Sequence, residues 1–233
     1  MTEFGKEVLQ GMKDKLDVEL LGVVSIESAT PKELRDRAIR LLPGVKSVVV
    51  VGKEIYREVV SLLTPSKEAG EAEAGELIGP HSEYLSGQLN KAIYGFANFF
   101  KKDGYQSLPL PAKGCPTDQR TLTALLSYKH VAQLAGLGTI GRNSLLITPE
   151  YGPRVRLACL LTEAPLESFS FSPPAGKQVC LQCDACIQAC PVQALHVPRE
   201  GEAYSMNPFA CRTYRQAGIT CSVCMKVCDE VLN

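Results

Sequence analysis

The sequence predicts an α/β domain followed by a small cysteine-rich module. Up to about residue 165, segments with apolar residues at helical spacing alternate with short β-branched runs. A proline-rich stretch, APLESFSFSPP at residues 164–174, then precedes a segment that holds eight of the ten cysteines. We therefore expect two domains, residues 1–174 and 175–233, and a chain of this length can bury one sizeable core beside a small module.

Periodicity and composition give the expected elements of the first domain. Helical spacing predicts helices over residues 4–21, 31–42, 81–102 and 119–135, and an amphipathic segment over residues 54–63. Strands are predicted at 45–51, 144–148 and 155–162, and a loop at 65–75. The run VKSVVVV lacks alternation, which indicates a strand buried on both faces at the centre of a sheet.

The charge balance and the N-terminal segment argue against several classes of protein. Lys plus Arg and Asp plus Glu number 25 each, so no net field attracts phosphate backbones or anionic lipid, and neither nucleic acid nor a membrane is expected as a partner. The N-terminal segment carries frequent charges in place of the apolar core of a signal peptide, and no apolar stretch approaches membrane-spanning length. We expect a cytoplasmic protein whose cysteines are metal ligands or redox groups.

The cysteine spacing predicts two iron–sulfur clusters. The first run, followed by Pro191, has the C-x2-C-x2-C-x3-C-P pattern of bacterial ferredoxins, in which three thiolates hold one cubane and the fourth ligates its neighbour. In a second run, the last three cysteines keep the C-x2-C-x3-C spacing, and the first lies further upstream. Structural zinc would also accept cysteines two residues apart, but it has no use for the third cysteine or the proline. The expected ligands are Cys180, Cys183, Cys186 and Cys228 for one [4Fe-4S] cluster, and Cys190, Cys211, Cys221 and Cys224 for the other.

A glycine motif, GLGTIG at residues 136–141, has the letters of a dinucleotide-binding fingerprint. That fingerprint must follow a strand and open a helix, whereas here a predicted helix precedes it and a strand follows. We instead expect a tight turn at which Gly136, Gly138 and Gly141 let something flat approach, such as a planar cofactor.

The segment KHVAQLAGLGTIGRNSLLITPEYGPRVRLACLLTEAPL and the cysteine runs after it resemble epoxyqueuosine reductases and the related reductive dehalogenases, over roughly residues 110–228. The resemblance implies a nitroreductase-like α/β domain that holds cobalamin. A two-cluster ferredoxin module would feed it electrons from a ferredoxin- or flavodoxin-type donor. Two features depart from the family: its proton-donating aspartate falls on Leu122, and the chain ends at Asn233 without the helical repeats that hold tRNA.

A reductive step on an organic substrate also needs a positioned acid. The candidates beside the glycine motif are Asp118, Tyr128, Lys129 and His130. Each has a structural alternative, which is a helix cap for Asp118 and an ordinary helix surface for the other three.

Several other residues have both a functional and a structural interpretation. Two histidines could ligate cobalt, donate to a cluster sulfur or be solvated loop residues. Two arginines could bind a carboxylate or phosphate of a ligand, or face solvent at a sheet edge. Of the remaining cysteines, Cys115 is expected to be a bystander thiol, with a redox role as the alternative, and Cys159 to be a core residue. These residues are His81 and His196, Arg154 and Arg156, and Cys115 and Cys159.

The expected function is that of an iron–sulfur oxidoreductase that reduces an unidentified small organic substrate through a corrinoid. Two alternatives stay open from the sequence. One is a non-catalytic electron-transfer or activator protein that docks to a partner protein, and the other is a reductase with flavin in place of the corrinoid.

Overall fold

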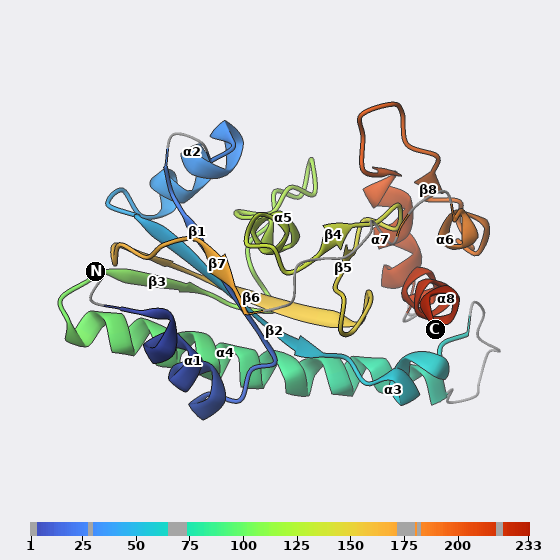
Figure 1. Cartoon of the computed structure of the whole chain (residues 1–233). Helices are drawn as coiled ribbons and strands as arrows, with labels where there is room; N and C mark the ends of the chain where they lie inside the picture. The colour runs from blue at the N-terminus through green and yellow to red at the C-terminus, as the bar shows by residue number, and fades with distance from the viewer. Residues whose placement is uncertain (1–3, 28–29, 65–73, 172–179, 181–182, 218–220) are drawn as a thin grey trace. The chain divides into compact units, whose positions relative to one another are not determined.

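A computed structural model describes the chain except for residues 1–3, 28–29, 65–73, 172–179, 181–182 and 218–220 (Figure 1). The chain forms two compact units. The first contains Met1–Lys53, Leu85–Leu137 and Arg156–Pro174, and the second contains Glu54–Tyr84, Gly138–Val155 and Ala175–Asn233. One boundary falls after residue 174, where the cysteine-rich domain was expected to begin, yet the second unit also includes two earlier segments. The two-domain division from the sequence therefore stays a prediction.

A five-stranded sheet with the order β3-β6-β2-β1-β7 organises the fold. Its strands are β1 (Leu20–Ser25), β2 (Ser47–Glu54), β3 (Ser107–Leu110), β6 (Val155–Thr162) and β7 (Phe169–Ser170). The pairs β1–β2, β1–β7 and β3–β6 are antiparallel. As predicted, the valine-rich strand β2 is central and is buried along nearly its whole length.

Helices cover both faces of this sheet. Figure 1 shows α1 (Lys6–Lys15) and α4 (Ile78–Lys102) along one face, where Leu9, Phe96 and Phe100 pack against Val49 and Val51. On the other side are α2 (Lys32–Leu41) and α5 (Tyr128–Leu134). The valines that alternate with these two along β2 are just as buried, which explains why the run shows no polar alternation.

The second unit consists of short elements. It contains α3 (Arg57–Ser61), the 3-10 helix Ala74–Leu77, the hairpin of β4 (Thr139–Ile140) and β5 (Leu146–Ile147), and α6 (Ala185–Gln188). A second hairpin joins β8 (Leu195–His196) to β9 (Ser205–Met206), followed by α7 (Pro208–Gln216) and α8 (Val223–Leu232). Helices α6 and α8 pack against each other. None of the described helices has the length and apolar character to cross a bilayer.

Two predicted helices are shorter than expected. The first ends at Lys15, because Asp17 adopts a left-handed backbone conformation (φ 51°) and the chain then turns into β1. The helix predicted over 119–135 begins only at Tyr128, since Leu122 also has a positive φ of 56° and Thr117 pairs with Ala124 in a β-bridge. Both apolar patterns continue past a residue that cannot continue a helix.

The other predicted helices and strands are present, but several observed elements were not predicted. They include β1, which begins inside the segment predicted as the first helix, β3, β4, β7, β8 and β9, and the helices α6, α7 and α8. Strands β3 and β7 were not predicted, because one lies in a proline-rich connection and the other in the stretch taken as a linker. Both are edge strands, where proline and short length are tolerated. Most of the loop predicted at 65–75 lies outside the described residues.

Candidate metal centre

Four thiols line one hollow in the second unit. Cys180, Cys183 and Cys186 come from the first cysteine run and the start of α6, and Cys228 comes from α8. The hollow has a volume of about 320 Å³, including space open to solvent, and Asn143 also lines it. The packing of α6 on α8 therefore brings the last cysteine of the second run to three cysteines of the first.

The electrostatics of these thiols show that they are neighbours. Burial, with Cys180, Cys186 and Cys183 adding to it, raises the pKa of Cys228 to about 12. Burial and the first two cysteines of the run likewise raise the pKa of Cys186 to about 11. Because metals bind the thiolate form, filling this site must release protons.

The other four cysteines form a second group of neighbours. Burial raises the pKa of Cys224 to about 12, and the nearby thiols of Cys221, Cys211, Cys186 and Cys190 add to the effect. The pKa of Cys211 is raised mainly by burial, and Cys221 and Cys190 contribute. Cys190, which ends the first run, influences both of these thiols, and Cys186 influences Cys224 as well.

The donor set of the hollow fits a four-iron cluster. A tetrahedral zinc ion holds its four ligands at about 2.1–2.3 Å from one point. In the part of the chain that the structure describes, no group of three or more His, Cys, Asp or Glu side chains is arranged to hold a single metal ion. Four thiols that line one hollow suit the corners of a cubane, which is held by thiolates alone.

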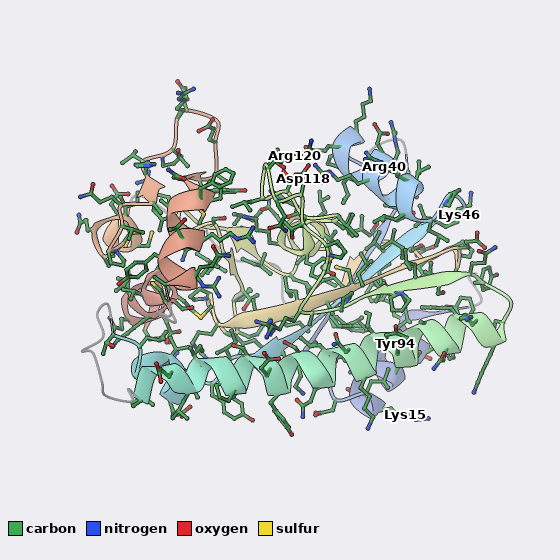
Figure 2. All side chains as sticks on the ribbon, turned by 180° about the vertical axis from the view of Figure 1, so that it is seen from behind. Lys15, Arg40, Lys46, Tyr94, Asp118 and Arg120 are labelled. Carbon is green, nitrogen blue, oxygen red and sulfur yellow. The ribbon has the colours of Figure 1, made fainter. Side chains whose placement is uncertain are left out.

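The predicted proton donors are engaged with the chain's own groups. Asp118 pairs with Arg120 at 3.0 Å on an exposed segment (Figure 2), and hydrogen bonds from this arginine lower the pKa of the carboxyl group. Asp118 caps no helix, because α5 begins after Ser127, so that interpretation was wrong. The hydroxyl of Tyr128 donates to the Pro111 carbonyl at 3.0 Å, and burial raises its pKa, so the phenol keeps its proton.

The next two candidates lie on the surface of α5. Lys129 is half-buried and His130 is exposed, with its Nδ1 atom 2.6 Å from the hydroxyl of Ser127. Partial burial, with the charge of Lys129, lowers the pKa of His130. The ordinary helix surface expected for these residues describes their placement.

The two remaining histidines differ in environment. His81 lies in α4, and its Nε2 atom accepts a hydrogen bond from the backbone N–H of Tyr56 at 3.2 Å, so it is not a solvated loop residue. Partial burial lowers the pKa of His81. His196 is exposed in β8.

Arg154 binds carboxylates, but they belong to the chain itself. It is 3% exposed, and it contacts Asp229 at 2.7 Å and Glu54 at 2.5 Å. Neither the predicted ligand clamp nor a solvent-facing edge describes this residue. Arg156 is half-buried and donates to the Ser86 hydroxyl at 2.6 Å. The buried Asp229 was not identified from the sequence, where nothing but its place after Cys228 distinguishes it.

The glycine motif lies between α5 and β5, as the predicted order of elements requires, and it also contains β4, which was not predicted. Gly136 has a φ of 80°, which only glycine adopts readily. A Cβ atom on Gly138 would lie 2.2 Å from the Ile147 carbonyl oxygen, and one on Gly141 would lie 2.6 Å from the Ile147 side chain. Strand β5, rather than a ligand, takes the space left at these two glycines.

The two cysteines outside the two cysteine groups match their expected roles in part. Cys159 is fully buried in β6, as predicted. Cys115 is half-buried, is not part of a disulfide, and forms a side-chain hydrogen bond with Tyr128.

Comparison with known proteins gives relatives of two kinds, although no family model matches the chain. It is 42% identical over 92 residues to the epoxyqueuosine reductase of Listeria monocytogenes, a match that covers 40% of this chain and 22% of the relative. It is 31% identical over 159 residues to a tetrachloroethene reductive dehalogenase of Desulfitobacterium hafniense, which covers 60% of this chain and 27% of the relative. The matches thus span about a quarter of the length of these relatives.

Solved structures of both kinds share the fold. A catabolic reductive dehalogenase superposes on 95% of this chain with a TM-score of 0.68 and 17% identity, over 31% of its own length. The epoxyqueuosine reductase from Streptococcus thermophilus superposes on 97% of the chain with a TM-score of 0.59 and 17% identity, over 65% of its own length. The resemblance predicted from the motifs is therefore confirmed: in sequence and in fold, this chain is similar to the epoxyqueuosine reductases and the reductive dehalogenases.

Proposed function

We propose that this chain is a reductase that carries two [4Fe-4S] clusters and passes their electrons to a corrinoid for the reduction of a small organic substrate. The names of its relatives of both kinds are those of reductases. The observation that carries the proposal is the hollow in which Cys228 meets Cys180, Cys183 and Cys186. Two runs of cysteines that interleave in this way are the ligand arrangement of a two-cluster ferredoxin.

The proposed ligands follow from the two groups of neighbours. One cluster would be held by Cys180, Cys183, Cys186 and Cys228, whose thiols share the hollow. The other would be held by the remaining set, in which the mutual influence on the thiol pKa values supports the grouping: Cys190, Cys211, Cys221 and Cys224. When bound, the clusters supply single electrons, which come from a reduced ferredoxin or flavodoxin.

The corrinoid part of the proposal is supported by the family. One solved reductive dehalogenase structure suggests a mechanism for B12-dependent dehalogenation, and it superposes on this chain with a TM-score of 0.66 and 17% identity. For the accompanying proton, the ionised Asp118 is a poor source, which leaves Tyr128, Lys129 and His130. An epoxyqueuosine reductase has been solved with a modified tRNA stem loop, but its TM-score of 0.48 carries no argument for RNA binding here.

A second candidate function is that of an electron carrier for a partner protein. The observation in its favour is that Asp118, the Tyr128 hydroxyl and Arg154 are all bound to groups of the chain itself. In a carrier these contacts would be purely structural. The two functions differ in whether the chain binds a corrinoid.

The test is anaerobic reconstitution with iron and sulfide, followed by metal analysis and electron paramagnetic resonance (EPR) of the reduced protein. We expect two four-iron clusters per chain in the unmodified protein and in the matched control Cys115→Ser, and loss of one cluster in Cys228→Ser. Zinc in place of iron, or equal iron in Cys228→Ser and the control, would contradict the cluster proposal.

Addition of cobalamin to the reconstituted protein then separates the two functions. A reductase of the proposed type retains cobalt through gel filtration and shows a corrinoid absorption band. A protein that keeps both clusters but binds no corrinoid is the carrier, and retention of added flavin instead would replace the corrinoid in the proposal.

A further inference from the structure

The tip of the β4–β5 hairpin is a rigid turn. Its backbone closes through Gly141 N–H to the Leu145 carbonyl at 2.9 Å and Ser144 N–H to the Gly141 carbonyl at 2.8 Å. The side-chain oxygen of Asn143 accepts a hydrogen bond from the Leu145 N–H at 3.1 Å. Since the glycine motif lets the strands approach so closely, the conformation of residues 141–145 is determined by the hairpin itself.

This tip lies against the first group of cysteines in the second unit. The backbone N–H of Arg142 donates to the Cys180 sulfur at 3.2 Å. The side chain of Asn143 is buried, lines the same hollow as the thiols and forms a hydrogen bond with Cys228. Its amide nitrogen also lies 3.4 Å from the Cys224 carbonyl oxygen.

The charged part of Arg142 is at the same place. Its guanidinium group forms an ion pair with Asp184, which follows Cys183 directly in the sequence. The side chain of Arg142 is only 20% exposed, so water screens this charge weakly. The tip therefore presents two N–H groups to a single set of thiols, and the Arg142 cation is paired with the carboxylate that follows one of them.

Hydrogen bonds to the sulfur ligands are one of the features that set the potential of an iron–sulfur cluster. Reduction adds one negative charge, which is shared with the thiolate sulfurs. A donor or a cation beside these sulfurs stabilises the reduced form more than the oxidised form. The potential of the cluster should therefore depend on residues that are far from the cysteines in the sequence.

We propose that Arg142 and Asn143 are positioning residues that raise the reduction potential of the cluster held by Cys180, Cys183, Cys186 and Cys228. The proposal rests on the proposed function, because it requires that cluster. It also gives the glycine motif a role: the motif holds the hairpin tip against the cluster ligands instead of binding a dinucleotide.

The test is an anaerobic redox titration with dithionite, monitored by EPR, on reconstituted full-length protein. Asn143→Asp keeps the acceptor for the Leu145 N–H but replaces the amide donor with a carboxylate, which is ionised at alkaline pH. We expect one of the two clusters to become harder to reduce, by at least tenfold in the ratio of reduced to oxidised cluster at a fixed potential, or about 59 mV for a one-electron step. The matched control is Asn98→Asp, which adds the same charge at an exposed position of α4.

Arg142→Gln is the second variant, since it removes the cation and keeps the backbone donor to Cys180. It should lower the potential of the same cluster. If both variants hold the full amount of iron and neither midpoint moves beyond that of the control, the proposal is wrong while the proposed function stands. If Asn143→Asp fails to load a cluster, Arg142→Gln decides in the same way. Unmodified protein that binds no clusters would overturn both.

Discussion

The buried pair of Arg154 and Asp229 gives the sharpest prediction for the stability of the second unit. The guanidinium group of Arg154 contacts Asp229, Glu54 and the carbonyl oxygen of Ile55, at 2.7, 2.5 and 2.9 Å. Arg154 and Asp229 are 3% and 5% exposed. Replacing Arg154 with methionine keeps most of the apolar volume and removes all of these contacts, which leaves two carboxylates without their shared cation.

The expected loss of unfolding free energy depends on the contacts that each carboxylate keeps after the substitution. Removal of one partner from a buried ion pair costs about 3–5 kcal/mol. Asp229 still has Arg57 at 3.1 Å, and the Glu54 side chain is 29% exposed and can turn toward water. We therefore expect the low end, about 3 kcal/mol, for Arg154→Met. With a urea dependence of about 3 kcal/mol per molar, the unfolding midpoint falls by roughly 1 M.

Urea unfolding followed by circular dichroism measures this shift, and two further variants interpret it. Arg120→Met breaks the exposed pair with Asp118 and should leave the midpoint unchanged, because exposed ion pairs contribute little. Arg154→Met combined with Asp229→Leu should recover part of the loss, since the double variant no longer buries a carboxylate that has lost its buried cation. A midpoint for Arg154→Met equal to that of Arg120→Met would refute this account of the pair.

Two more predictions concern the glycine motif and a histidine. Gly138→Ala should destabilise the protein by about 1–3 kcal/mol in the same urea assay, because its Cβ atom meets the Ile147 carbonyl oxygen, whereas Gly87→Ala on the open surface of α4 should stabilise it by about 0.5–1 kcal/mol. His81 has a lowered pKa when folded, so its contribution to stability is present above its ordinary pKa of 6.5 and is lost as the pH falls through the lower folded value. His81→Gln should flatten the pH dependence of the urea midpoint in this range, and an unchanged profile would contradict it.

Much of the fold could be predicted because the signals are local. The valine run predicts β2 and the apolar spacing predicts α4, and in each case the pattern lies within the element itself. The errors occur where one backbone conformation overrides an apolar pattern, as at Asp17 and Leu122 with their positive φ angles. Aspartate adopts this conformation more often than leucine does, but neither residue requires it, so the periodicity of the neighbours extended both predicted helices too far.

The polar contacts of the second unit could not be predicted, for a different reason. Arg154 was predicted to bind a carboxylate or phosphate of a ligand or to face solvent, whereas it binds carboxylates of its own chain. Its partners Glu54 and Asp229 lie 100 and 75 residues away. Ion pairs have no spacing rule at such separations, and an arginine that serves its own chain looks the same in sequence as one that waits for a ligand.

The candidate metal centre combines a local signal that the sequence reveals with contacts between distant residues that it does not. The cysteine spacing is local and predicts the metal and the grouping of ligands from residues 180–228 alone. The N–H donors come from residues 142 and 143, which reach Cys180 and Cys228 only because Gly138 lets β5 pass within contact of β4. A motif with the letters of a nucleotide-binding loop thus has a packing requirement as its physical cause. If Asn143→Asp shifts the cluster potential, the glycine motif affects the cluster through the hydrogen bond between Asn143 and Cys228. Neither the glycine motif nor the cysteine spacing predicts this hydrogen bond by itself.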